Sequence, residues 1–343
     1  MTETPAAQLS AAQTSVKTAA TRYAFLGPFG TFTELALRQF LQAEGVTITS
    51  NQPEEIEAAT GLKLLPCRDV GQALKMVREG EADRAVIPLE NSVEGGVNAS
   101  LDALVHGEPL QIVGETAIPI DFCLVVREGI KPEQVRRVGT HPHAWAQCRN
   151  WIEDHFPGTT HVPATSTAAA ANLLTEDRYP GFEAALCNAV AAQTPGLVTL
   201  ADGIADNPNA VTRFVLVSRP GRTPAPTGAD KTTVQVRLPD NEAGALLNML
   251  EQFSARGVNL SRIESRPGGG RLGTYEFSVD IEGHIAERRV QAALTGLHRT
   301  CPQVRFVGSY PRFDAKPNTV ETGTEDSAFE AATAWVESLL TQD

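Results

Sequence analysis

The sequence predicts an open α/β protein followed by a smaller ferredoxin-like unit. Between residues 22 and 218, short apolar runs typical of strands alternate with segments whose apolar residues recur at helical spacing. Residues 232–310 then give the order strand, helix, strand, strand, helix, strand, which is the βαββαβ pattern of a ferredoxin-like fold. Three prolines and two glycines in residues 219–229 exclude a helix or a central strand there, so this segment is a linker.

The first region follows a regular course along the chain. We expect strands at residues 23–26, 84–88, 136–140, 184–186 and 211–218, and helices at 33–44, 70–79, 100–105, 144–156, 168–174 and from residue 188 onward. Residues 117–127 are largely apolar and predict one long strand that crosses between two subdomains. Open α/β layers bind ligands at the carboxyl ends of their strands, so a site is expected in the loops that follow these strands.

The second region and the two ends of the chain complete the division into domains. We expect strands at residues 232–238, 258–266, 274–281 and 304–310, and helices at 242–256 and 286–298. Residues 327–340 predict an amphipathic helix that docks on the protein or on a partner subunit, with a frayed acidic tail as the alternative. The predicted parts are a disordered tail (1–21), a first domain (22–219), a linker (220–231), a second domain (232–311) and an acidic tail with the terminal helix (312–343).

Charge and residue usage narrow the classes of function. The 343 residues contain 29 Lys and Arg against 41 Asp and Glu, a formal net charge of −12, which disfavours a nucleic-acid partner. No apolar run approaches the roughly 20 residues that span a bilayer. Five cysteines without a CxxC pair indicate reduced thiols in a reducing compartment, and we expect a cytoplasmic protein. The histidines lack a metal-binding spacing, so no metal is expected.

Five loops at predicted strand ends carry glycines or polar residues. They are GPFGTF (27–32), IPLENSVEGGV (87–97), THPH (140–143), TSTAAA (165–170) and TRF (212–214). Glycines let the backbone approach a ligand closely, and the free N–H groups at a helix start can bind a carboxylate. None of the five matches a nucleotide-binding loop, and no cofactor is expected. Each alone could be a capped turn, but their shared position favours one cleft.

The TRF string places a cation at the start of an apolar strand. Arg213 must find a partner or a cleft there, and its guanidinium can hold a carboxylate in a bidentate manner. A surface arginine at a strand start is the alternative reading.

The order of these strings carries a family resemblance. GPFGTF, IPLENSVEGGV, THPHAWAQC, STAAAA and TRF together make residues 22–219 resemble prephenate dehydratases. Residues 232–311 resemble an ACT regulatory domain and contain GALL (244–247) and ESRP (264–267), which are typical of the phenylalanine site of this family. The resemblance implies a catalytic region of two lobes around a cleft, similar to periplasmic binding proteins. One departure is His143, where the family more commonly has a glutamine.

The resemblance implies a reaction without a cofactor, the removal of water and carbon dioxide from prephenate to give phenylpyruvate. Thr212 would assist the departing hydroxyl, with Glu90 as a neighbouring acid. Arg213 would clamp a substrate carboxylate, and Phe214 would wall the ring. The other residues expected to contact the substrate are Thr31, Phe32, Asn91, Ser92, His141, Ser166 and Thr167.

The resemblance also implies feedback by L-phenylalanine, bound between the ACT domains of a homodimer or homotetramer. The residues expected at this effector site are Gly244, Ala245, Leu246, Leu247, Asn259, Leu260, Glu264, Ser265, Arg266 and Pro267. About 21 residues precede the first domain, which is too few for the helical chorismate mutase domain that some relatives carry, so a monofunctional enzyme is expected. Two alternatives stay open: an arogenate dehydratase and a non-catalytic amino-acid sensor.

Overall fold

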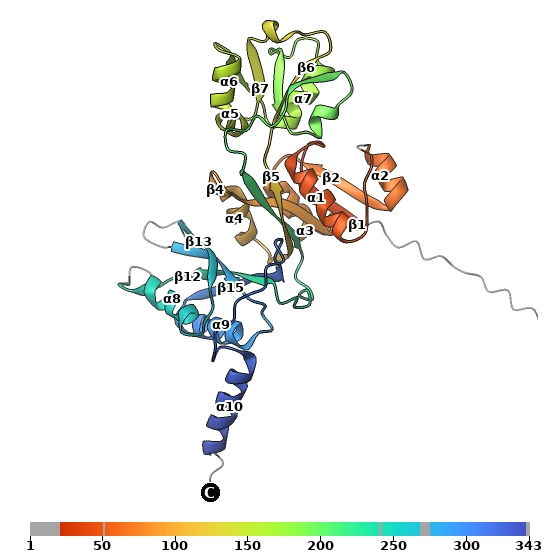
Figure 1. The fold of residues 1–343 in the computed structure, drawn as a ribbon. Helices are drawn as coiled ribbons and strands as arrows, with labels where there is room; N and C mark the ends of the chain where they lie inside the picture. The colour runs from red at the N-terminus through yellow and green to blue at the C-terminus, as the bar shows by residue number, and fades with distance from the viewer. Residues whose placement is uncertain (1–20, 51, 240–241, 268–274, 341–343) are drawn as a thin grey trace, which may run out of the picture.

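The computed structural model describes residues 21–50, 52–239, 242–267 and 275–340. It contains a first lobe, a second lobe and a C-terminal unit (residues 230–311), and a terminal helix extends away from the rest (Figure 1). The order of elements in the C-terminal unit confirms the predicted βαββαβ pattern.

The first lobe is built on five main strands. These are β1 (Thr21–Leu26), β2 (Leu62–Cys67), β3 (Arg84–Asn91), β5 (Gln111–Pro119) and β11 (Val211–Ser218), with a short β4 (Gly95–Gly96) paired to β3. Its helices are α1 (Phe32–Ala43), α2 (Pro53–Thr60), α3 (Val70–Arg78) and α4 (Asn98–Val105). One apolar core under α3 and α4 and another under α1 cover the two faces of this sheet.

The second lobe has its own five-stranded sheet in the order β10-β6-β9-β7-β8. The strands are β6 (Cys123–Arg127), β7 (Arg137–Thr140), β8 (Thr160–Pro163), β9 (Ala184–Cys187) and β10 (Leu197–Ala201). The helices are α5 (Pro142–Gln147), α6 (Arg149–His155) and α7 (Thr167–Glu176), with two short 3₁₀ turns, η1 (Pro132–Gln134) and η2 (Ala191–Gln193). Ala168, Ala170 and Ala171 of α7 are fully buried, so this small-residue face lets α7 lie close to the sheet.

Two segments connect the lobes, residues 120–122 between β5 and β6 and residues 202–210 between β10 and β11. They lie side by side, since the backbone N–H of Ile120 donates to the carbonyl of Ala210 at 2.7 Å. Asn188 adds a contact across the lobes, because its Nδ2 donates to the carbonyl of Gly30 at 2.7 Å.

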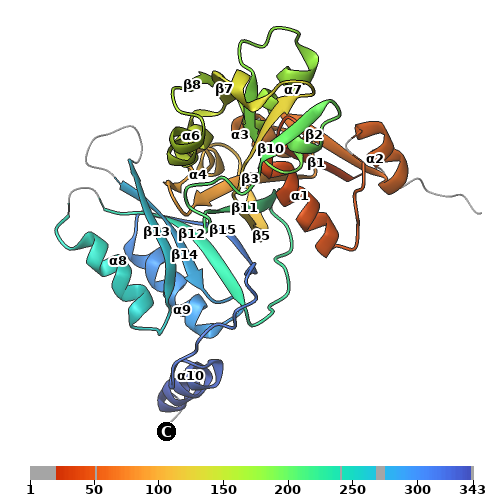
Figure 2. The same ribbon diagram turned by 45° about the horizontal axis from the view of Figure 1, so that its top comes forward.

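The C-terminal unit continues the sheet of the first lobe (Figure 2). It consists of β12 (Asp230–Arg237), α8 (Ala245–Ser254), β13 (Leu260–Pro267), β14 (Tyr275–Glu282), α9 (Arg288–Thr300) and β15 (Gln303–Pro311). The joint is the parallel pairing of β15 with β5 at Gly308 and Ile112. A Cβ atom on Gly308 would collide with the backbone of Ile112, so only glycine permits this approach.

Several predicted elements differ from the structure. The long strand expected at 117–127 is two strands, because the chain changes sheet at residues 120–122. The helix expected at 144–156 is α5 and α6, since the backbone of Cys148 leaves helical geometry at φ −122° and ψ 8°. The helix expected from residue 188 is only the η2 turn. The sequence analysis did not predict helix α2 or strands β2, β8 and β10.

The predicted tails have different outcomes. Residues 1–20 lie outside the described residues, whereas Thr21 already belongs to β1. The terminal helix is present as α10 (Asp326–Leu340), and its first turn contacts α9 through Asp326, whose Oδ1 accepts from the backbone N–H of Arg288 at 2.8 Å. Trp335 and Leu340 further along α10 are largely exposed. Within the described residues, no helix has the length and apolar character needed to cross a membrane.

Candidate active site

The two lobes enclose a cleft of about 1030 Å³, enough for a small metabolite with its water. Its walls are the loops after β1, β2 and β3 in the first lobe, the loops after β7 and β8 in the second lobe, and the start of β11. Eight residues predicted to contact the substrate line it: Thr31, Phe32, Asn91, His141, Ser166, Thr167, Thr212 and Phe214. The structure therefore brings together residues from four of the predicted loops and the TRF strand.

Thr212 is oriented as a hydrogen-bond donor toward the cleft. Its Oγ1 accepts a hydrogen bond from Nδ2 of Asn91 at 2.9 Å, and these two residues face each other across β3 and β11. The orientation of the Asn91 amide follows from its other end, where Oδ1 accepts the backbone N–H groups of Val93 at 2.8 Å and Glu94 at 3.1 Å. Asn91 occupies one lone pair of the Thr212 hydroxyl, and its O–H remains able to donate to a molecule in the cleft.

Two helix starts line the cleft from opposite lobes. Thr31 caps α1, where its Oγ1 donates to the carbonyl of Leu26 at 2.9 Å and accepts from the backbone N–H of Glu34 at 3.3 Å. Ser166 caps α7, where its Oγ accepts from the backbone N–H of Ala169 at 2.9 Å. The partial positive charge at a helix N-terminus favours an anion; at α1 the carboxylate of Glu34 already accepts the N–H of Gly30, whereas the first turn of α7 has no acidic residue and can bind a carboxylate group.

A polar group joins the lobes at the cleft. His143 Nδ1 lies 2.8 Å from Glu94 Oε2, and Gln147 Nε2 donates to Glu94 Oε1 at 3.2 Å. His141 Nδ1 accepts from the backbone N–H of His143 at 3.3 Å. Burial, together with the neighbouring His143, lowers the pKa of His141, so at neutral pH its ring is uncharged and carries its proton on Nε2. His141 is thus a neutral hydrogen-bond donor.

An apolar wall and a single arginine complete the lining. Phe32 and Phe122 meet edge to face with ring centroids 5.7 Å apart, and Phe214 lies in the core beside α1. Arg68 follows β2, and among the described residues of the lining it is the one with a permanent positive charge. Its Nε donates to Asp69 Oδ2 at 3.1 Å, and its side chain is 83% exposed, so the guanidinium is accessible to a ligand.

The comparison with protein families agrees with this cleft. The family model described as prephenate dehydratase matches residues 23–222, which is more than half of the chain and contains every residue of the cleft lining. The chain belongs to the prephenate dehydratase family. It is therefore a carbon–oxygen lyase whose reaction removes water and carbon dioxide from prephenate.

Individual relatives extend the match over nearly the whole chain. The prephenate dehydratase of Mycolicibacterium gilvum is 43% identical over 317 residues, 92% of this chain and 97% of the relative. The solved structure of prephenate dehydratase from Arthrobacter aurescens, in complex with L-Phe, is 51% identical with a TM-score of 0.84 and covers 94% of this chain and 100% of its own. A structure described as GqqA, a novel type of quorum quenching acylases, is 32% identical with a TM-score of 0.70 over 84% of this chain and 97% of its own.

Three residues predicted for the dehydratase site do not line the cleft. Strand alternation sends Arg213 to the face opposite Thr212 and Phe214, where its Nε donates to the carboxylate of Glu115 at 2.6 Å. The predicted carboxylate clamp is therefore wrong for Arg213. Glu90 faces the same side as Arg213, 3.5 Å from its Nη1, and is not the acid beside Thr212. Ser92 binds the backbone instead of the cleft, since its Oγ accepts a hydrogen bond from the N–H of Val211 at 2.9 Å.

Two residues that line the cleft, Arg68 and Glu94, were not predicted from the sequence. Arg68 follows β2, a strand that was not predicted, so nothing placed it at a strand end with the other loops. Glu94 lies inside the quoted IPLENSVEGGV string. The turn that Asn91 makes with the backbone of Val93 and Glu94 brings this carboxylate to the cleft, and an Asx turn is a readable signal.

The donor geometry of Thr212 gives a first prediction. Thr212→Val keeps the shape of the side chain and removes the hydroxyl, so we expect kcat with prephenate to fall about 100-fold while KM changes little. Asn91→Ala should give a smaller loss of kcat in the same assay, because the hydroxyl stays but loses its orientation. Thr199→Val, the same change at an exposed position of β10, is the control. A Thr212→Val enzyme that loses kcat and affinity equally, or loses neither, would contradict the role of Thr212.

Proposed function

We propose that the cleft performs the decarboxylating dehydration of prephenate with Thr212 as the donor to the departing hydroxyl. The C4–O bond breaks with its electron pair and the oxygen is protonated to water. The bond from the ring to its carboxylate breaks at the same time, and its electron pair completes the aromatic ring as carbon dioxide leaves. The observation that carries this proposal is the Asn91–Thr212 hydrogen bond of 2.9 Å at the cleft lining, because Asn91 acts as the donor and the Thr212 hydroxyl can then donate to the substrate. A threonine hydroxyl is a weak acid, so it acts by hydrogen bonding, and the one proton that converts the departing hydroxide to water is taken up from the bulk solution.

The substrate itself is the next test. We expect the purified protein to form phenylpyruvate from prephenate at neutral pH and to convert arogenate to phenylalanine far more slowly, with both products followed by chromatography. An acyl substrate of a quorum quenching acylase serves as a negative control. Faster turnover of arogenate would make the chain an arogenate dehydratase, and no turnover of either would favour the non-catalytic sensor.

We propose that Arg68 holds one of the two carboxylates of the substrate. A dianion needs a cation near it, and Arg213, the residue first expected in this role, is engaged on the other face of β11. The helix start at Ser166 supplies further N–H groups for the second carboxylate. This arrangement lets a chain of net charge −12 present a locally positive cleft.

Substitution of Arg68 checks this assignment. Arg68→Ala should raise KM for prephenate about tenfold or more with a smaller change in kcat, because it removes a charge-assisted hydrogen bond made in both the ground state and the transition state. Arg68→Lys should recover part of the affinity. Arg149→Ala removes an exposed arginine that pairs with Glu153 away from the cleft, and it should leave KM unchanged. An unaltered KM in Arg68→Ala would remove Arg68 from substrate binding.

We propose that the C-terminal unit is an ACT domain that binds L-phenylalanine at an interface between subunits. The solved relative in complex with L-Phe, 51% identical, supports the ligand. Gly244 precedes α8 in the left-handed region at φ 84° and provides no side-chain cap, while the N–H of Ala245 donates to the carbonyl of Glu242 at 3.3 Å. Leu246, Leu247 and Ile263 are exposed on the same unit and supply apolar surface for a dimer or tetramer.

Five free thiols support a cytoplasmic protein.

The effector proposal predicts a coupled response. L-phenylalanine at roughly millimolar concentration should bind in calorimetry, lower the rate with prephenate and increase the sedimentation coefficient. D-phenylalanine is the matched control, because it has the same apolar group with the opposite arrangement of charges. A rate that stays constant while L-phenylalanine is bound would count against feedback, and no binding at all would remove the effector site.

A further inference from the structure

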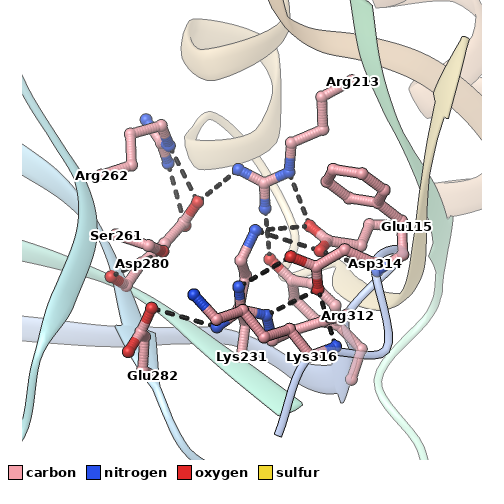
Figure 3. A network of polar contacts seen from close by, with 12 residues as sticks. Glu115, Arg213, Lys231, Ser261, Arg262, Asp280, Glu282, Arg312, Asp314 and Lys316 are labelled. Atoms are coloured by element: carbon pink, nitrogen blue, oxygen red, sulfur yellow. Dashed lines mark hydrogen bonds and ion pairs between the residues drawn. The ribbon is translucent and has the colours of Figure 1, made fainter. Parts of the chain in front are cut away.

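The back of the catalytic strand β11 is fastened to the C-terminal unit by a buried ion network. Arg213 of β11 donates to Glu115 of β5 at 2.6 Å and to Asp280 of β14 at 2.5 Å (Figure 3). Its third nitrogen donates to the hydroxyl of Tyr310 of β15 at 2.9 Å. Each of the three guanidinium nitrogens of Arg213 therefore donates a hydrogen bond, and two of these bonds go to the C-terminal unit.

The network extends to further charged residues of the C-terminal unit. Arg262 of β13 donates to Asp280 from Nε at 3.0 Å and from Nη2 at 3.1 Å, and Lys231 of β12 lies 3.0 Å from Glu115 (Figure 3). The side chains of Glu115 and Asp280 are fully buried, and those of the three cations are at most 9% exposed. Within this set three buried cations face two buried anions, so removing the charge of either carboxylate leaves a further cation uncompensated in the interior.

Burial alone would favour the neutral acid of Asp280, but Arg213 and Arg262 outweigh it and hold the pKa of this carboxyl well below its usual range. Asp280 is thus ionised throughout the physiological pH range. The position of Arg213 is set by fixed charges rather than by solvent, because little water reaches the site to screen them.

Arg213 is the direct neighbour of Thr212 along the chain, so the network and the cleft act on opposite faces of one strand. Asn91 holds Thr212 from the cleft side at 2.9 Å. Glu115 and Asp280 hold the next residue from behind. A bulge interrupts the pairing of β11 with β3 between Arg213 and Phe214, whereas the pairing with β5 is regular there, so the side-chain contacts add to the β5 ladder in placing Thr212.

The ion network also contacts the ESRP string, which belongs to the expected L-phenylalanine site. Nη1 of Arg262 lies 3.4 Å from Oε2 of Glu264, the first residue of the ESRP string. The carboxylate of Glu264 lies against Gly96 of β4, which lines the cleft, and leaves no room for a Cβ atom there. Arg266 of the same string donates to Asp102 of α4 at 2.6 Å and 3.0 Å. One end of the ESRP strand is therefore in contact with the catalytic lobe at several points.

We propose that Arg213 and Asp280 are positioning residues that hold Thr212 in its catalytic orientation and transmit to it the state of the C-terminal unit. The transmission part rests on the proposed effector function, whereas the positioning part needs only the dehydratase activity. A ligand that moves β13 or β14 displaces Asp280 and Arg262, and β11 follows because Arg213 is bound to Asp280. Thr212 then leaves the orientation that Asn91 and the cleft require.

The central experiment uses Asp280→Asn in the full-length protein. The change keeps the shape and removes the charge, and we expect kcat with prephenate to fall about 10- to 100-fold while KM changes less than about threefold, as for a catalytic group displaced by a fraction of an ångström. In a Thr212→Val background the same change should lower kcat little further, because the group that it positions is already gone. Calorimetry should still detect L-phenylalanine, but its effect on the rate should be lost.

Glu282→Gln is the matched control. It lies on β14 two residues after Asp280 and neutralises a carboxylate that pairs with Arg312 at 3.0 Å, without contact to β11. This variant should retain kcat and the response to L-phenylalanine. If Asp280→Asn and Glu282→Gln have the same kcat, or if Asp280→Asn lowers kcat by the same factor with and without the Thr212 hydroxyl, the network is merely structural and the proposal fails.

Tyr310→Phe covers the case in which Asp280→Asn does not fold. It removes one hydroxyl from the network, where Tyr310 also contacts Thr233 Oγ1 at 2.6 Å, and it leaves both charges of the Arg213–Asp280 pair. We expect a fall in kcat of about threefold at unchanged KM in a protein whose circular dichroism matches the wild type. An unchanged kcat would overturn the positioning role. A wild-type enzyme that does not respond to L-phenylalanine would remove the transmission part alone.

Discussion

Burial of the Arg213 guanidinium is the constraint on which the arrangement of the catalytic lobe and the C-terminal unit depends. A cation removed from water needs anions at close range, and neither unit supplies them alone: Glu115 comes from β5 and Asp280 from β14. The two units are therefore complementary in charge and also share one sheet through Gly308 and Ile112. The predicted linker therefore joins two units that are also connected by a sheet and by buried ion pairs.

The sequence predicted more of the architecture than of the side-chain directions. The alternation of apolar runs and helical periods located most elements, and the βαββαβ order was correct for the C-terminal unit. The errors fall where tertiary structure overrides local pattern. Residues 117–127 look like one strand because both halves are buried, although they lie in different sheets, and β2 was missed although Arg68 of the cleft follows it. The local signals were Pro119 and Asp121, which interrupt the apolar run where the chain leaves one sheet for the other.

In the candidate site, too, the positions of the loops were predicted better than the directions of the side chains. Loops at strand ends were identified correctly as the walls of one cleft, because that rule depends on topology. The direction of each side chain depends on strand phase, and here the residues themselves held the answer: Thr212 and Phe214 face one way, so Arg213 had to face the other. Its partner Asp280, 67 positions later in the chain, could not be paired with it from sequence, since their contact exists only after both units have folded.

The two lobes are joined by two segments that are hydrogen-bonded to each other at Ile120 and Ala210. Two connections that lie side by side restrain sliding and twisting of the lobes more than a single connection would. The lobes also meet directly, through Asn188 with Gly30 and through Glu94 with His143. Substrate entry and the exclusion of water both require these direct contacts to break and form again, while the two connections stay intact.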